Sequence, residues 1–450
     1  MIILRNLSIA AVILASSVSF AQSAGDEPTA PDVATAPVPG DESGRTDPLD
    51  PGDGAVRRIA RGALFVPRVA ITVVFAPLEG LAWAVERYRV IDRARRLFFN
   101  DAGTVGLFPT LELQSGLGVT IGARFVDRDL VGAGERVDLR ASVGGRFLQR
   151  YSAALHSGER FGKRVSLEAK ALYERRPEDA FYGIGNSDMT TEARFRHRIA
   201  RITGGFDARV GGDLHLRGAG ALADHAFEQS DSGPPVGALY QAMPLAGFEH
   251  GFRDGYGELE LRWDSRRSAV AWEPPSILAT GSLAAVFAGR VTSLGGGSDF
   301  WRYGVDLQHF LRLGPGPRVL VLRAHGEAVT GSRAEVPFDE LPRLGGENLL
   351  RGYPLDRFRD RALLVGSVDY QWDLARSLSA SLFADAGRVY ESIRGIDLTG
   401  LRVGYGVAVE FHTDHSFLAR ASLASSIDGG VFLNLALNPV FDLDERAERR

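Results

Sequence analysis

Residues 401–412 read LRVGYGVAVEFH, and large apolar side chains occupy every second position of this stretch. The apolar set is Leu401, Val403, Tyr405, Val407, Val409 and Phe411, and the alternate set is Arg402, Gly404, Gly406, Ala408, Glu410 and His412. Successive side chains of an extended strand point to opposite faces, so the stretch has one apolar face and one polar or small face. The pattern predicts a β-strand between two different environments.

The same period of two residues recurs from residue 104 to residue 440. Soluble sandwiches alternate as well, but their strands are shorter than these segments of about ten residues or more. Long alternating strands with aromatic residues near their ends are typical of a transmembrane barrel, which pairs every backbone group inside the bilayer. We therefore predict an all-β fold, a 16-stranded antiparallel transmembrane β-barrel over residues 101–441, preceded by a short N-terminal helical segment. The predicted strands are residues 104–114, 117–127, 134–146, 148–157, 164–174, 192–210, 213–229, 252–264, 279–292, 299–312, 317–331, 361–374, 377–389, 401–412, 416–425 and 430–440.

The connections between these segments differ in length in a regular way. If both ends of the barrel lie in the periplasm, the turns on that side are short, as at residues 211–212 and 375–376. The long connections, residues 175–191, 230–251 and 332–360, then lie on the outer side. Short periplasmic turns and longer outer loops are typical of outer-membrane barrels.

Four segments at the chain ends do not alternate. Residues 1–24 have the layout of a cleavable signal peptide; a single anchoring helix is the alternative, although the apolar run is shorter than the roughly 20 residues of a membrane span. Residues 25–54 contain six prolines and eight acids and are predicted to be a disordered linker. Residues 55–100 have apolar positions at helical spacing and predict a periplasmic amphipathic helical segment, packed on a domain end or lying on a membrane surface. Residues 442–450 form a charged tail.

Composition excludes several classes of protein. The chain has no cysteine, which rules out disulfides, a thiolate nucleophile and cysteine metal ligands. Its net charge is −4, and its 52 lysines and arginines are scattered, so we expect no nucleic-acid partner. The partner that a membrane barrel requires is the lipid of the outer membrane.

We find no catalytic, cofactor-binding or metal-binding pattern in the sequence. None of the nine histidines forms a convincing ligand set, and His412 and His415 are three residues apart in a predicted turn rather than on a helix. Ser367, Ser379 and Ser381 have the parity of the lumen, but no G-x-S-x-G turn accompanies them. We therefore predict no enzymatic activity, no cofactor and no bound metal.

Residues 341–360, LPRLGGENLLRGYPLDRFRD, form a polar connection whose arginines and acids need partners. Phe383 and Asp385 have the parity of the lumen in their strand. Arg351, on a loop folded into the barrel, would meet Asp385 in a bidentate, charge-assisted contact, with Asp369 as a second candidate acceptor. The alternatives are that these residues never meet, or that the donor is another arginine of the loop: Arg343, Arg357 or Arg359.

Four short motifs resemble those of one family. Leu350-Arg351-Gly352-Tyr353 resembles the arginine-glycine-aromatic signature in the sixth extracellular loop of the BamA/TamA-type outer-membrane assembly barrels, the bacterial surface antigen (D15) superfamily. Residues 383–387, FADAG, which end at Gly387, resemble that family's F-x-D-x-G pattern on strand thirteen. Residues 181–187 (FYGIGNS) and 130–134 (LVGAG) resemble two shorter patterns. The resemblance implies a bacterial outer-membrane barrel in which the loop arginine is locked against the inner wall.

The resemblance also implies a role in inserting or translocating proteins, or lipids, with client or accessory periplasmic proteins as partners. The family's barrels usually carry periplasmic POTRA modules that collect the client, and no such module fits in residues 55–100. Pro109 and Pro439 lie in the two predicted strands that must pair to close the barrel, and proline cannot donate to a strand ladder. They predict a weak seam, unless they simply mark strand ends. The alternative function is a passive channel or structural barrel that has lost the assembly role.

Overall fold

The computed structural model describes the chain from residue 97 to residue 437 in nine stretches. They are residues 97–114, 118–145, 148–186, 192–237, 245–267, 279–314, 317–375, 378–412 and 417–437. The predicted signal peptide, the linker, the charged tail and Pro439 lie outside them, as does the predicted helical segment except for its last four residues. Within these stretches, no helix has both the length and the hydropathy that crossing a membrane requires.

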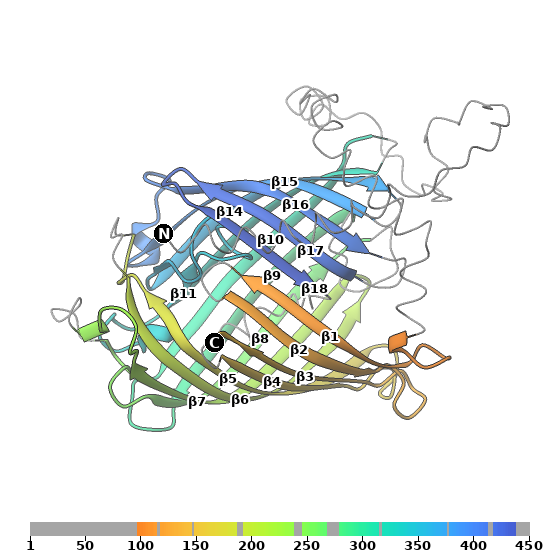
Figure 1. The fold of residues 1–450 in the computed structure, drawn as a ribbon, viewed down its shortest axis with the longest axis horizontal. Helices are drawn as coiled ribbons and strands as arrows, with labels where there is room; N and C mark the ends of the chain where they lie inside the picture. Colours follow the sequence, from red (N-terminus) through yellow and green to blue (C-terminus); the bar gives the residue numbers. More distant parts are fainter. Residues whose placement is uncertain are drawn as a thin grey trace, which may run out of the picture. The chain divides into compact units, whose positions relative to one another are not determined.

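Sixteen antiparallel strands close into a barrel, as predicted (Figure 1). Each pairs with the barrel strands before and after it in the chain, and the last returns to pair with the first. The strands are β1 (Val105–Gln114), β2 (Gly118–Asp127), β3 (Arg136–Gly144), β4 (Gln149–His156), β5 (Val165–Phe181), β6 (Ala193–Gly211), β7 (Leu214–Gln229), β8 (Phe252–Asp264), β9 (Gly281–Ser293), β10 (Phe300–Arg312), β11 (Arg318–Val329), β14 (Ala362–Ala375), β15 (Leu378–Tyr390), β16 (Arg402–His412), β17 (Phe417–Ser426) and β18 (Val431–Leu437). The predicted fold class is confirmed.

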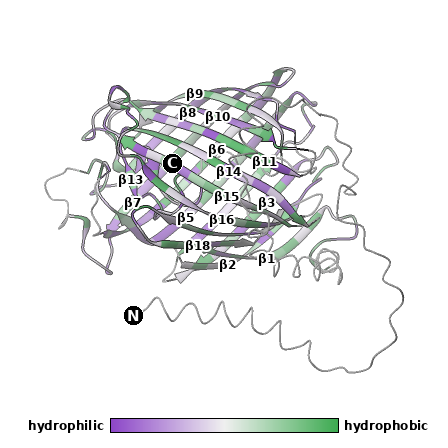
Figure 2. Ribbon diagram, turned by 90° about the horizontal axis from the view of Figure 1, so that it is seen from above, coloured by the Kyte–Doolittle hydropathy of each residue, from purple (hydrophilic) through white to green (hydrophobic). Residues whose placement is uncertain are grey.

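The two faces of the barrel have different chemistry, as the alternation along the strands predicts. Large apolar side chains are exposed on many strands, among them Leu107, Ile121, Leu139, Leu155, Ile202, Leu222, Leu259, Val286, Trp301, Leu307, Val368, Tyr405 and Leu423. Figure 2 shows hydrophobic and hydrophilic residues side by side along the same strands. Ion pairs occupy the inner face; for example, Arg323 Nη2 donates to Asp306 Oδ2 at 2.7 Å. An apolar exterior around a polar interior is what a barrel in lipid needs.

One strand end was predicted wrongly by seven residues, whereas the other strand ends within the described residues differ from the prediction by at most two. β5 continues to Phe181 instead of ending at residue 174, so the loop that follows it begins at residue 182. The pairing of β5 with β6 shifts in register between Arg176 and Asp179. Such an irregularity accommodates Pro177, which cannot donate to the ladder. Polar composition did not mark the end of the strand, because a strand that extends past the bilayer needs no apolar outer face.

The pairing of β18 is described to different extents on its two edges. All seven of its residues pair with β17, whereas three pair with β1. By contrast, all ten residues of β1 pair with β2. Pro109 of β1 lies opposite Ala123 of β2, and among the described residues it has no partner on β18. In this register the partners of residues 105–110 of β1 would be residues 438–443, which lie outside the described stretches, so the described pairs cover one end of the seam and the predicted weak seam stays a prediction.

The connection between β11 and β14, residues 330–361, is called the inserted loop below. It contains the 3-10 helix η2 (Phe338–Glu340) and a small sheet of β12 (Arg343–Leu344) and β13 (Phe358–Arg359). A buried apolar cluster joins the loop to β14 and β15; its members are Leu344, Leu349, Leu350, Tyr353, Phe358, Leu363, Val365 and Val389. Because these loop side chains are buried against the strands, the loop packs on the barrel wall instead of extending into solvent.

Candidate functional site

Arg351 fixes the inserted loop to the barrel wall. Its side chain is buried, and its Nε and Nη2 donate to the two carboxylate oxygens of Asp385 on β15 at 2.8 and 2.6 Å. The backbone N–H of Arg351 donates to the same carboxylate at 2.8 Å. A bidentate pair of this kind fixes direction as well as distance.

The same guanidinium reaches Asp369 on β14, to which Nη2 and Nη1 donate at 2.6 and 3.2 Å. The ring of Phe383 lies below it, with its centroid 3.8 Å from the guanidinium carbon, which is a cation–π contact. The sequence left Asp385 and Asp369 as alternative acceptors, and the structure places both on Arg351. We call Arg351, Asp369, Phe383 and Asp385 the arginine anchor.

Two glycines allow the backbones of the loop and the wall to approach at the anchor. Gly352 has φ +90°, and a Cβ there would lie 2.1 Å from the carbonyl oxygen of Ser425. A Cβ on Gly404 would lie 1.6 Å from the carbonyl oxygen of Arg351. Only glycine fits at these two positions without a shift of the backbone. Gly387, the end of the FADAG motif, is less constrained, since a Cβ there would meet β14 at 3.0 Å.

Tyr353 extends the anchor toward the last strands. Its hydroxyl donates to Asp428 Oδ2 at 2.8 Å, and Arg402 Nη1 donates to the same oxygen at 3.0 Å. Burial and the contact with Asp428 together raise the pKa of Tyr353 to about 12. Asp428 lies in the turn between β17 and β18, so the Arg351-Gly352-Tyr353 motif connects the loop to the strand pair beside the seam.

The three arginines that the sequence left as alternative donors make other contacts. Arg343 Nη1 donates to Asp339 and Asp356 at 3.1 and 2.9 Å. Arg357 lies over two aromatic rings, with their centroids 4.8 and 4.6 Å from its guanidinium carbon. Arg359 Nη1 donates to a carbonyl oxygen of the loop itself at 3.4 Å.

The motif at residues 181–187, described as far as residue 186, also contacts the inserted loop. The N–H of Gly185 donates to the carbonyl oxygen of Arg359 at 2.8 Å. Asn186 Oδ1 accepts the N–H of Val389 on β15 at 3.1 Å, and its carbonyl oxygen accepts from Arg402 at 3.0 Å. Two of the outer loops are thus bonded to each other and to the same strands.

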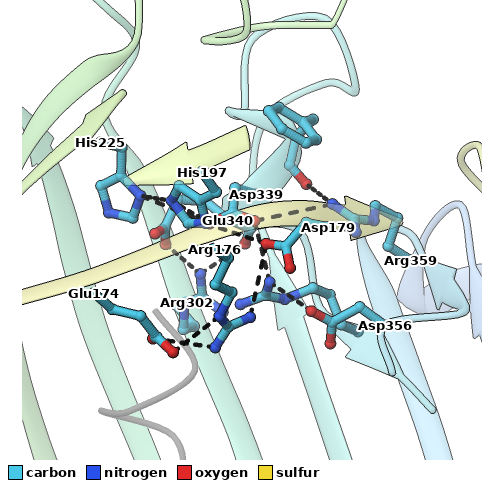
Figure 3. Close-up of polar contacts among 12 residues, drawn as sticks. Glu174, Arg176, Asp179, His197, His225, Arg302, Asp339, Glu340, Asp356 and Arg359 are labelled. Atoms are coloured by element: carbon cyan, nitrogen blue, oxygen red, sulfur yellow. Dashed lines mark hydrogen bonds and ion pairs between the residues drawn. The ribbon is translucent and has the colours of Figure 1, made fainter. Parts of the chain in front are cut away.

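A second region joins η2 to β6, β7 and β10 (Figure 3). Arg302 of β10 donates through Nη2 to the side chain and the carbonyl oxygen of Glu340, both at 2.6 Å. Beside it, Asp339 Oδ2 lies 3.8 Å from His197 Nε2 and 3.6 Å from His225 Nδ1. These two ring nitrogens are 3.2 Å apart. We call His197, His225 and Asp339 the histidine cluster.

The histidine cluster is buried among charges and aromatic rings. Burial alone would raise the pKa of the Asp339 carboxyl, but the charges of Arg343, the two histidines and Arg359 hold it well below its usual range. The ring of Phe227 stacks on His197 with a centroid distance of 4.6 Å, and a second phenylalanine ring stacks on His225 at 4.3 Å. Asp339 therefore remains a carboxylate in a site that solvent does not reach.

Sequence reasoning missed the histidine cluster. His197 pairs with Phe227 across the β6–β7 ladder, so His225, two residues away, is its diagonal neighbour on the same face. The register shifts between Arg209 and Gly211, so counting outward from the short turn at residues 211–212 would have placed His197 opposite Ala226 and His225 on the other face. No sequence signal points to Asp339 either, because its place depends on how the inserted loop folds.

A cavity of about 200 Å³ remains beside the arginine anchor. Its lining includes charged residues of both signs, among them Arg323, Asp306, Glu410 and Arg420. The cavity has room for ordered waters among these charged side chains. The arrangement is suited to holding the inserted loop in place.

Comparison with known proteins gives a family match and a fold match. Residues 129–428 match the family model of the Omp85 superfamily domain. Among solved structures, BamA from Haemophilus ducreyi lacking POTRA domains 1–3 is similar with a TM-score of 0.51 and 16% identity, covering 74% of this chain and 70% of that one. CdiB from Acinetobacter baumannii and CdiB from Escherichia coli have TM-scores of 0.47 and 0.49, each with 9% identity and 74% of this chain covered, over 60% and 62% of their own lengths. No curated protein gives a significant match.

Proposed function

This chain belongs to the Omp85 superfamily of outer-membrane barrels, and we propose that it assists the insertion or translocation of proteins, or of lipids, at the bacterial outer membrane. The route that we propose is the seam between β1 and β18. The observation that carries the proposal is that the barrel closes between the first and last strands of the chain, where residues 112–114 of β1 pair with residues 434–436 of β18.

Opening the seam would expose a strand edge. Pro109 of β1 has no N–H to donate to either neighbouring strand, so β1 forms fewer ladder hydrogen bonds than a strand of its length can form. An opened edge of β1 would offer unpaired N–H and C=O groups to an incoming strand.

Because the chain has no cysteine, an engineered disulfide can test the seam directly. Leu113 and Leu435 are opposed across it, and cysteines at both positions would form a disulfide on oxidation, because opposed Cβ atoms lie about 4.5–5.5 Å apart, close to disulfide geometry. The double variant is expressed in cells depleted of the unmodified protein. We expect depletion to lower the amounts of outer-membrane proteins or lipids, oxidation of the double variant to cause the same loss, and a reductant to reverse it.

A matched pair on the other edge of β18 is the control. Leu423 and Leu433 are opposed between β17 and β18, so cysteines there lock a ladder that the proposal leaves closed. Oxidation of this pair is expected to leave outer-membrane composition unchanged. Normal composition with the seam locked would refute the proposed route.

The alternative, a passive channel, makes a different prediction. The inserted loop is docked on the barrel wall, and a cavity of about 200 Å³ is left beside its anchor. In planar bilayers we therefore expect only small, flickering currents from the unmodified protein. A large, steady conductance would favour the channel function over the assembly function.

Recruitment of the client is a further part of the proposal. We propose that accessory periplasmic proteins deliver the client to the barrel. Cross-linking in intact cells, followed by isolation of the barrel, would identify such partners. Recovery of outer-membrane lipid alone would argue against delivery by a protein.

A further inference from the structure

We propose that the histidine cluster is a binding site for one divalent transition metal ion of the Zn²⁺ type. Two imidazole nitrogens and one carboxylate oxygen converge there: His197 Nε2, His225 Nδ1 and Asp339 Oδ2. Imidazole and carboxylate are ligands that Zn²⁺ uses, and sites with three protein ligands leave a fourth position open. The inference is independent of the proposed function.

The separations between the three atoms fit one ion. They are 3.2, 3.6 and 3.8 Å. With metal–ligand bonds of about 2.0–2.1 Å, the edges of a tetrahedron of ligands are about 3.3–3.4 Å long. Each separation is within half an ångström of that value. Small rotations of the side chains would bring the three atoms around a common centre, replacing the contact between the two ring nitrogens.

The two oxygens of the Asp339 carboxylate face different partners. Asp339 Oδ1 faces the arginines, with Arg343 Nη1 at 3.1 Å and Arg359 Nη1 at 4.0 Å. Its Oδ2 faces the two histidines at distances too long for a good hydrogen bond. One oxygen is thus engaged in ion pairs, and the other is directed to the place where the ion would lie.

Other groups around the cluster have the positions of outer-shell partners. Histidine ligands usually donate their second ring nitrogen to a carboxylate, which fixes the tautomer. Asp179 Oδ2 lies 3.6 Å from His197 Nδ1, the nitrogen not used for the ion. His225 Nε2 is buried without a hydrogen-bond partner in the described structure, and Asp254 and Glu340 each offer an oxygen within 4.8 Å of this histidine. These acids also supply negative charge next to the nearby arginines.

Without a metal, the cluster would be a structural pair of hydrogen-bonded histidine rings. In that state one ring donates to the other, and Asp339 has no strong contact with either ring. The ion would use all three groups at once, and it would connect β6 and β7 to η2 of the inserted loop. Metal binding would therefore add a second attachment between the loop and the wall.

The test uses the full-length protein, without a histidine tag, refolded in detergent and treated with a chelator. Titration with ZnCl₂ is expected to show one ion per chain, and CoCl₂ is expected to give the visible absorption of a tetrahedral site. Added Zn²⁺ should also slow proteolysis of the inserted loop, and a chelator should reverse this. Absence of stoichiometric binding in the unmodified protein would overturn the proposal, whatever the variants do.

Variants locate the site. His197→Gln and His225→Gln should each weaken Zn²⁺ binding at least tenfold, while the heat-modifiable gel band reports that the barrel still folds. His215→Gln is the matched control, because His215 Nδ1 contacts one carboxylate, Asp207, at 2.7 Å and belongs to no such cluster in the described chain. Equal loss of binding in the control, or retained binding in both cluster variants, would refute the assignment.

Discussion

The arginine anchor and the histidine cluster hold the same loop by different means. At the anchor, Arg351 donates to both oxygens of Asp385 and to Asp369, at distances down to 2.6 Å. At the cluster, Asp339 is 3.6 Å or more from both histidines, and His225 Nε2 has no hydrogen-bond partner among the described groups. The first attachment is complete as it stands, whereas the second becomes complete with a ligand. The difference suggests one permanent and one conditional attachment of the loop.

Removing the permanent attachment should have the largest effect. Arg351→Ala leaves Asp385 buried with a lost partner, and breaking a buried ion pair costs about 3–5 kcal/mol. We expect faster proteolysis of the inserted loop and unfolding at a lower urea concentration. The gel shift of the heat-modifiable band measures the unfolding. If the loop of this variant resisted protease as well as the unmodified loop, the anchor would not be what holds it.

Crowding the anchor without removing a charge should have a smaller effect. The Cβ of Gly404→Ala would overlap the carbonyl oxygen of Arg351, and overpacking costs about 1–3 kcal/mol. Gly257→Ala is the matched control, because no atom lies within 4 Å of the Cβ that it would introduce in β8. The same urea titration checks both variants. Equal destabilisation by the two substitutions would show that the close approach at Gly404 does not matter.

Asp339→Asn tests the conditional attachment. Arg343 retains Asp356 at 2.9 Å after the substitution, so the lost contacts should cost about 1–2 kcal/mol, less than the loss at Arg351. The urea midpoint in the presence of a chelator measures this directly. A cost as large as that of Arg351→Ala would mean that the two attachments contribute equally without metal.

The smallest expected effect is a pH dependence at Tyr353. Its pKa is raised to about 12 by burial and by the contact with Asp428, so the folded state favours the protonated hydroxyl. The stability from this group is fully present below the unfolded value of about 10 and is lost as pH rises through 12. Unfolding midpoints between pH 9 and pH 12, compared with those of Tyr353→Phe, measure it. Identical pH profiles for the two proteins would exclude Tyr353 as the titrating group.

The sequence predicted those parts of the molecule that depend on side-chain parity. Alternation along strands such as residues 401–412 led to the barrel, and parity alone put Phe383 and Asp385 on the inner face. Parity does not indicate where a strand stops outside the membrane, and for this reason the end of β5 was predicted seven residues too early. It also carries no information on loops, so the meeting of Asp339 with His197 and His225 could not be foreseen.

The seam between β1 and β18 has a consequence for how the barrel folds. The other barrel strands pair with their neighbours along the chain, but Glu112 and Ala436 pair across more than 300 positions. Closing so long a loop costs more chain entropy than pairing strands that are adjacent in the chain, so closure is the step with the highest entropic barrier. Tyr353 reaches the β17–β18 turn and thereby helps to position the last strand. We therefore expect the inserted loop to influence the rate of barrel closure as well as the stability of the closed barrel.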